Sequence, residues 1–134
     1  MKYLLDVNVL VAWGWKEHSD HSRVARWVGH ERSRPGTEFL SAPIPELGFI
    51  RVSVQRAAGA VSVKEACEAL DEMFASLGKT HSFIADDQRA TNLPTWCKDA
   101  SRTTDGHLLE LANAHGAKLA TLDTGIPGAF VVPT

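Results

Sequence analysis

Cysteine is scarce in this sequence of 134 residues, which has only Cys67 and Cys97. The two lie far apart and form no Cys-x-x-Cys pair, so we expect neither a disulfide framework nor a zinc cluster. We interpret both as small apolar side chains of a protein in a reducing compartment.

The sequence also lacks an excess of either charge, because 14 Lys and Arg oppose 16 Asp and Glu, which leaves a formal net charge of −2. The overall charge therefore does not indicate a nucleic-acid partner, although a local basic patch or a bound metal can supply a positive field. No GxGxxG or GxxxxGK[ST] pattern occurs, which disfavours nucleotide binding through a glycine loop.

Long apolar runs are absent as well. No segment has 18 uninterrupted apolar residues, so we expect no membrane span. The apolar N-terminal stretch is broken by Asp6 and Asn8 and is followed by no small-residue cleavage site, which argues against a signal peptide. We expect a cytoplasmic protein.

The length and the hydrophobic fraction of 44% fit one globular domain over residues 1–134. Short apolar segments, which predict strands, alternate with helical patterns. The expected strands cover 3–5, 38–41, 82–85, 118–122 and 129–132. The expected helices cover 9–15, 20–33, 62–77, 92–99 and 104–115, and another opens at 42–46 and continues through 54. Ser62 and Glu65 form an expected capping box at the start of 62–77. This alternation predicts an α/β fold, in which helices cover both faces of a central parallel sheet of about five strands.

Four acidic residues follow the expected strands at similar places. Asp6 ends the first strand, Glu46 lies in the first turns of the helix after the second, Asp105 begins a late helix, and Asp123 follows the fourth strand. Because the carboxyl ends of parallel strands meet at one edge of a sheet, we expect these carboxylates to converge.

Converging carboxylates repel each other by roughly 3 kcal/mol per pair at about 5 Å and an effective dielectric of about 20. A hard divalent cation such as Mg²⁺ would neutralise them, and it suits hydrolysis of a phosphodiester. Each acid also has a structural explanation, because Glu46 and Asp105 complement helix dipoles and Asp123 suits a turn. Asp6, between two apolar runs, is hardest to explain in that way.

Other polar residues have candidate roles around these acids. Asn8 could hydrogen-bond Asp6, and Thr104 and Thr121 could orient a carboxylate or water. Helix caps explain Asn8 and Thr104 equally well, and a buried strand position explains Thr121. Arg51 could hold a phosphate, with a solvated helix position as the alternative. We expect no metal role for His18 and His21, which have no obvious acidic partner.

Three segments carry a resemblance to a known family. The segments LLDVNVLVA, PELGFIRV and TTDGHLLELANAHGAKLATLDTGI are similar to the successive motifs of PIN-domain ribonucleases, and most of all to the VapC toxins of bacterial toxin–antitoxin pairs. The stretch AWGWKEHSDHSRVARWV resembles the first helix–loop–helix of that group. The resemblance covers nearly the whole chain and implies a PIN-like three-layer α/β/α fold.

The resemblance implies a metal-dependent endoribonuclease toxin that cleaves RNA by water attack and is neutralised by a VapB-type antitoxin. Asp6, Glu46 and Asp105 match the three principal metal-binding acids, Asp123 matches a fourth, and Asn8 matches the residue that supports the first. The implied cofactor is Mg²⁺ or Mn²⁺, and the implied assembly is a homodimer. We expect Asp6 and Asp105 to hold the metal directly, and Arg51, Arg89 and Arg102 to guide RNA. Gly106 departs from the alanine more common after the third acid.

Two other interpretations stay open. A phosphatase of the haloacid-dehalogenase type also begins with a strand and an Asp, but it needs a second Asp where this chain has Asn8. A non-catalytic module that binds RNA or a partner is the other, with Trp13 and Trp15 as interface candidates.

Overall fold

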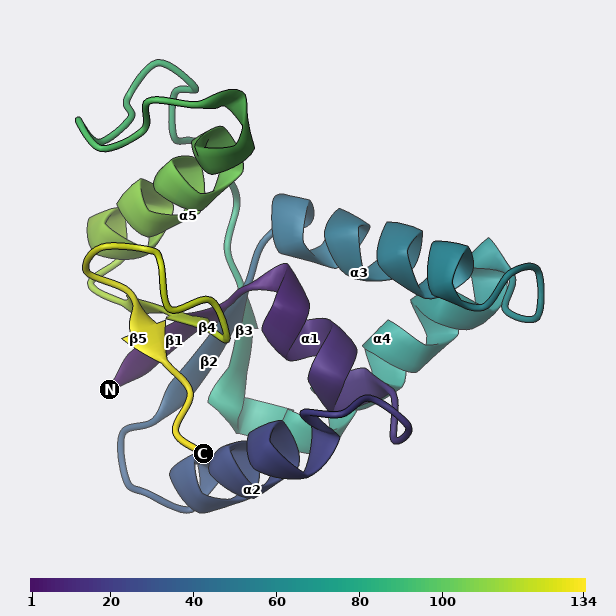
Figure 1. Ribbon diagram of the computed structural model, residues 1–134. Coiled ribbons are helices and arrows are strands. Elements are labelled where there is room, and N and C mark those ends of the chain that lie inside the picture. Colours follow the sequence, from purple (N-terminus) through teal and green to yellow (C-terminus); the bar gives the residue numbers. More distant parts are fainter.

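The computed structural model describes all of residues 1–134 and contains a sheet of five parallel strands in the order β3-β2-β1-β4-β5 (Figure 1). The strands are β1 (Lys2–Leu5), β2 (Glu38–Ser41), β3 (His81–Phe83), β4 (Lys118–Thr121) and β5 (Phe130–Val131). All four strand pairings are parallel. The predicted α/β fold with a five-stranded parallel sheet is confirmed.

Helices cover both faces of the sheet, as predicted. They are α1 (Val7–Gly14), α2 (His21–Arg32), α3 (Pro43–Arg56), α4 (Val63–Leu77) and α5 (Thr103–Ala114), with two short 3₁₀ segments, η1 (Gly78–Thr80) and η2 (Ala100–Arg102). Helix α5 lies on one side of the sheet in Figure 1, and the other four helices lie on the opposite side. None of them is long and apolar enough to cross a membrane.

The alternation of side chains along each strand divides the core between these two layers. Leu4, Leu40 and Leu119 pack in one cluster with the buried leucines of α5. Tyr3 and Phe39, one residue before Leu4 and Leu40, belong to a larger cluster with α1, α2, α3 and α4. The three-layer arrangement therefore follows from the strand patterns.

Local sequence signals explain several helix ends. Ser62 and Glu65 form the expected capping box at the start of α4, and Gly78 ends that helix with a φ of 57°. Pro43 begins α3, where a missing backbone N–H costs no helical hydrogen bond.

Two predictions about the region before α5 are wrong. Residues 92–99 form turns and irregular chain, and the first helical segment after them is η2. This region lacks an apolar stripe, and its turn around Pro94 packs on α5 instead of continuing as a helix. Thr104 does not cap α5, because the helix begins at Thr103 and no side chain caps it.

Trp15, predicted to end the first helix, lies just beyond α1 and is partly buried. Its ring stacks on that of Phe49 with 6.1 Å between the centroids, and its Nε1 donates to Ser53 Oγ at 2.8 Å. Trp13 also packs against the larger core cluster. Both tryptophans therefore have structural roles, and their interface role stays a prediction.

Candidate active site

Asp6 lies at the carboxyl end of β1 and begins α1. Its side chain is buried, with 7% exposed, and each of its two oxygens accepts a hydrogen bond. Oδ1 accepts from the backbone N–H of Val7 at 2.8 Å, and Oδ2 accepts from Thr121 Oγ1 at 2.8 Å. The carboxylate is therefore fixed by both the strand–helix junction and the neighbouring strand β4.

Thr121, at the end of β4, connects the polar groups around Asp6. Its fully buried hydroxyl donates to Asp6 and accepts from Asn8 Nδ2 at 3.1 Å and from the backbone N–H of Asp123 at 3.1 Å. Asn8 Oδ1 accepts from the N–H of Leu122 at 3.0 Å. Asn8 and Thr121 therefore lie in direct hydrogen-bond connection with Asp6, and their supporting role stays a prediction.

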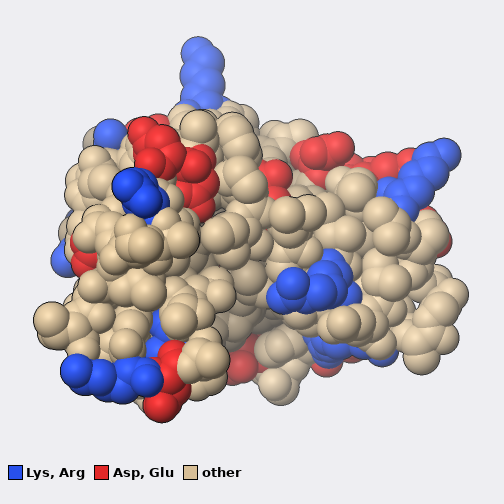
Figure 2. All heavy atoms as spheres, turned by 90° about the horizontal axis from the view of Figure 1, so that it is seen from above, with Lys and Arg blue, Asp and Glu red and all other residues tan.

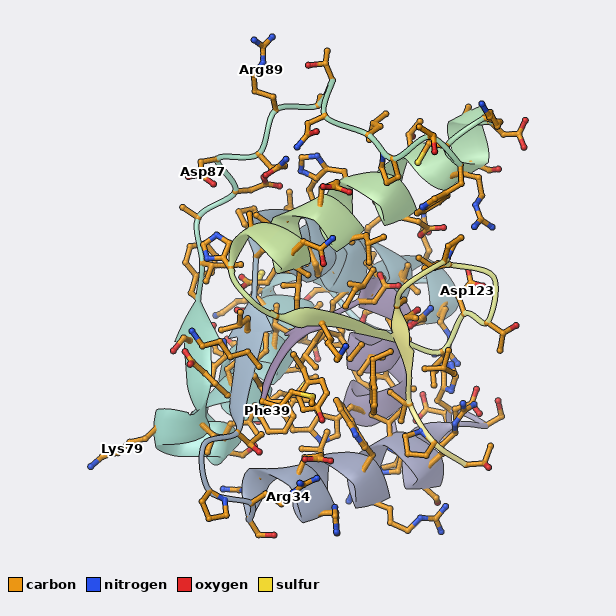
Figure 3. The ribbon with its side chains drawn as sticks, turned by 90° about the vertical axis from the view of Figure 1, so that its left-hand side faces the viewer. Arg34, Phe39, Lys79, Asp87, Arg89 and Asp123 are labelled. Atoms are coloured by element: carbon orange, nitrogen blue, oxygen red, sulfur yellow. The ribbon has the colours of Figure 1, made fainter.

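Asp123 lies in the turn between β4 and β5 (Figure 3). Its Oδ1 accepts from the N–H of Gly125 at 2.7 Å, which orients the carboxylate within the turn. Asp105 lies in the first turn of α5 and is partly buried.

Three of the four predicted acids share one electrostatic environment. Burial raises the pKa of Asp6, and the negative charges of Asp105 and Asp123 raise it further, against the hydrogen bonds from Thr121 and Val7. Burial and the charge of Asp123 also raise the pKa of Asp105, while Arg102 lowers it. The fold therefore holds Asp6, Asp105 and Asp123, here called the acidic cluster, in mutual repulsion.

Glu46 differs from these three residues. It lies in the first turn of α3, its side chain makes no hydrogen bond or ion pair, and its charge does not contribute to the raised pKa of Asp6 or Asp105. The structure thus brings three of the predicted acids together and leaves the fourth without a direct connection to them.

The donor chemistry of the acidic cluster fits a hard divalent cation. Carboxylate oxygens are the protein ligands that Mg²⁺ prefers, and a cation would offset the repulsion that raises the pKa values of Asp6 and Asp105. No group of three or more His, Cys, Asp and Glu side chains is close enough to enclose an ion. A cation site at the cluster is therefore a proposal that rests on the donor chemistry of its carboxylates, and Mg²⁺ needs few of them because it keeps several waters.

A cleft of about 450 Å³, here called the central cleft, opens beside Asp6 and Asp105. Arg51, a candidate phosphate ligand, lines this cleft, and so does Thr104, a candidate for orienting a carboxylate or water. His18, for which we expected no metal role, and Arg56, which was not predicted for the site, line it as well. No sequence pattern links Arg56 to the acids, because they come from separate segments that only the fold brings together.

The other two arginines that we expected to guide RNA lie differently. Arg102 Nη2 donates to the carbonyl of Gly125, and its guanidinium lies 5.1 Å from the centre of the Trp96 ring. Arg89 projects outward from its loop (Figure 3). In Figure 2, Lys and Arg form separate patches interrupted by acidic side chains, so this face has no continuous basic surface.

Two glycines allow close approaches near the site. A Cβ at Gly48 of α3 would overlap the side chain of Val7, which directly follows Asp6. A Cβ at Gly106 of α5 would overlap Cys97 Sγ and touch Pro94 Cδ at 3.0 Å. Gly106, next to Asp105, therefore lets the 94–97 turn pack directly on the helix.

We expect Gly106→Ala to destabilise the fold by about 1–3 kcal/mol through overpacking, offset by about 1 kcal/mol of improved helix propensity. Urea denaturation of Gly106→Ala, Cys97→Ala and the double variant would measure this. Because Cys97→Ala removes the clashing sulfur, the double variant should be more stable than the sum of the two single effects. Additive effects would contradict the predicted contact.

Curated relatives cover nearly the whole chain. Ribonuclease VapC39 of Mycobacterium tuberculosis is 34% identical over 131 residues, which are 94% of this chain and 91% of that protein. Ribonuclease VapC38 of the same species is 34% identical, covering 92% of this chain and 86% of the relative. For Ribonuclease VapC44 the identity is also 34%, with coverage of 96% and 94%. No protein-family model matches the chain.

A parallel α/β/α sheet with acidic residues at its carboxyl edge is the arrangement that the PIN-like resemblance implied, and the relatives carry the VapC name. The chain belongs to the VapC family of PIN-domain toxins.

Proposed function

We propose that this chain is a metal-dependent endoribonuclease toxin that hydrolyses RNA phosphodiester bonds and is neutralised by a VapB-type antitoxin. The observation that carries the proposal is the acidic cluster beside a cleft that Arg51 and Arg56 also line. The ribonuclease names of the relatives support the choice of substrate.

In this proposal Asp6 and Asp105 hold Mg²⁺ or Mn²⁺, which when bound activates water and stabilises the leaving oxygen. Thr121 and Asn8 keep the Asp6 carboxylate in one orientation. Glu46 and Asp123 act at longer range, through water or at a second ion.

Arg51 and Arg56 hold phosphates of the RNA strand in the central cleft, where their charges also offset the negative field of the acidic cluster. We also propose that the chain acts in the cytoplasm as a homodimer.

The structure disfavours the phosphatase alternative. That reaction needs a proton donor at position 8, but both polar atoms of Asn8 are hydrogen-bonded, to Thr121 and to Leu122. An amide in this position orients Asp6 and has no proton to give. The non-catalytic alternative requires a decayed site, but the chain keeps all three acids of the acidic cluster and Glu46 as well.

Incubation of purified protein with total RNA in Mg²⁺, Mn²⁺ or EDTA, beside an Asp105→Asn variant, tests the proposal. We expect discrete cuts that need the metal and disappear in the variant. Absence of cuts in both metals from folded protein would refute the ribonuclease activity and favour a binding module. Cuts that persist in EDTA would refute the metal dependence alone.

We expect Arg51→Gln to weaken RNA binding, because one phosphate contact is lost. The slope of log binding constant against log salt should fall by about 0.7, the value for one contact to single-stranded nucleic acid. Binding is measured by fluorescence anisotropy in EDTA, so that cleavage does not interfere. Arg32→Gln, at the exposed end of α2 and outside the cleft, is the matched control and should bind like the wild type. If Arg51→Gln and Arg32→Gln show the same salt dependence of RNA binding, Arg51 does not contact a phosphate of the RNA.

A further inference from the structure

A second hollow adjoins the central cleft. It has a volume of about 220 Å³ and is formed by α3, the loop after β3 and the start of α5. We call it the base groove, and it is lined by Ile44, Ala90, Leu93, Thr103, Thr104 and His107. Thr104 lines both hollows, so the base groove continues directly from the site of Asp6 and Asp105.

Two anchors hold the outer wall of the base groove against α5. His107 Nε2 lies 2.7 Å from Asp86 Oδ2, and both side chains are largely buried, with 12% and 13% exposed. Asp86 Oδ1 also accepts from the N–H of Gln88 at 3.1 Å. At the other end, the turn containing Pro94 and Cys97 packs on Gly106. The groove is therefore formed before any ligand binds.

The lining chemistry matches a nucleobase. Ile44 and Leu93 supply apolar surface from two different segments, which suits the flat faces of a base. The Thr104 hydroxyl and the second ring nitrogen of His107 make no intramolecular hydrogen bond, so they are free to contact a base edge. No Lys, Arg, Asp or Glu lines the groove, so a phosphate has no charged partner there.

We propose that the base groove binds one unpaired nucleobase of the RNA strand, next to the phosphate at the acidic cluster, and thereby selects the nucleotide accepted at that position. This inference rests on the proposed ribonuclease function. The arrangement separates two tasks: Arg51 and Arg56 hold the strand by its phosphates, which are the same in every nucleotide, and the base groove reads the base. A base bound in the groove must be unstacked, which favours single-stranded or looped RNA.

The test uses an RNA oligonucleotide cut by the wild type, and versions in which each nucleotide beside the cut is replaced in turn by an abasic one. At one position, we expect the abasic nucleotide to lower kcat/KM of the wild type by about tenfold or more, the scale of losing apolar pocket contacts. In Ile44→Ala and Leu93→Ala, the same replacement should change kcat/KM by less than about twofold, since the contacts are already absent.

Leu47→Ala is the matched control, because Leu47 also lies on α3 but is 63% exposed and lines neither hollow. It should keep the full abasic effect. Thr104→Val is a second variant that tests the free hydroxyl at an exposed position, where folding is not at risk. We expect it to change the base preference at the same position in a library with randomised nucleotides beside the cut.

An abasic effect of equal size in the wild type, Ile44→Ala and Leu93→Ala, with an unchanged preference in Thr104→Val, would overturn the inference and leave the ribonuclease function intact. A folded wild type that cuts no RNA would overturn the proposed function and this inference with it. Thermal denaturation of each variant separates a loss of folding from a loss of base contact.

Discussion

Asp6→Asn is expected to abolish RNA cleavage while making the metal-free protein more stable at neutral pH. The activity is lost because an amide is a much weaker ligand for a divalent cation than a carboxylate. The stability rises because the wild-type carboxylate is buried and is repelled by Asp105 and Asp123. A neutral amide removes both costs.

Most of the hydrogen bonds around position 6 can survive this change. The new amide oxygen can accept from the N–H of Val7, and its nitrogen can donate to the Thr121 hydroxyl in place of one of the two donors, Asn8 Nδ2 and the Asp123 N–H, that this oxygen accepts in the wild type. That hydroxyl can then turn toward Asn8 Oδ1, which lies 3.4 Å away. Asp6→Ala, which loses these bonds, is therefore the poorer variant for this test.

The pH dependence of the free energy of unfolding tests the role of the Asp6 charge more directly than stability at a single pH. The pKa of Asp6 is higher in the folded protein than its ordinary value, so between the unfolded and folded pKa values the native state binds more protons. The free energy of unfolding of the metal-free wild type therefore falls as pH rises through this window and stays lower above it. In Asp6→Asn, the free energy of unfolding should fall less over the same pH range. The fall that remains should come from Asp105, whose pKa is also raised.

Thermal denaturation of both proteins between about pH 3 and pH 8 in EDTA would show this difference in slope. Added Mg²⁺ should restore stability in the wild type only, by about 2.7 kcal/mol at a hundred times its dissociation constant. If Asp6→Asn melts at a lower temperature than the wild type at neutral pH, the proposed repulsion at Asp6 is wrong. If Mg²⁺ stabilises Asp6→Asn as much as the wild type, Asp6 is not a metal ligand.

Thr121→Val is expected to lower the stability of the fold strongly, because it removes hydrogen bonds that hold the buried polar groups around Asp6. Valine nearly keeps the shape of threonine, but the lost hydroxyl takes a donor from Asp6 and an acceptor from the amide of Asn8 and the N–H of Asp123. Buried groups left without a partner cost about 1–3 kcal/mol each, so we expect a loss of about 2–4 kcal/mol after partial relaxation. The pKa of Asp6 should rise further, since the Thr121 hydrogen bond lowers it.

Thr121→Ser is the matched control because it keeps the hydroxyl and loses one methyl group. Urea denaturation should place it well above Thr121→Val in stability, and RNA cleavage should follow the same order. Equal stability of the two variants would mean that the hydroxyl does not hold Asp6, Asn8 and Asp123 together.

The sequence was sufficient to predict the sheet and the acids that end its strands, because both depend on local patterns. Buried segments such as 3–5 and 38–41 alternate with amphipathic helices, and a parallel sheet brings strand ends to one edge. Asp6 and Asp123 follow their strands directly, so their positions could be inferred without coordinates. Glu46 lies a helical turn away from its strand end, and its distance from the other acids depends on how α3 is tilted.

The features that could not be predicted depend on contacts between distant segments. The 92–99 region contains helix-compatible residues, but its turn packs on Gly106, and only the tertiary contact shows why that position lacks a side chain. The lining of the central cleft likewise depends on distant segments, because His18 after α1, Arg51 and Arg56 of α3, and Thr104 of α5 line the same hollow as Asp6. No local sequence pattern predicts such contacts between distant segments.

Gly106 has a consequence for divergence among homologues. A homologue with alanine at this position and cysteine at position 97 must hold its 94–97 turn farther from α5, because the added methyl group would occupy the space of Cys97 Sγ. That turn follows directly on Leu93, which forms part of the outer wall of the base groove. A single methyl group, one residue after Asp105, could therefore alter which RNAs a homologue recognises while leaving every acid in place. If the proposed base groove reads RNA, toxins of this kind can acquire new targets through the backbone next to the acidic cluster, with every carboxylate of the cluster unchanged.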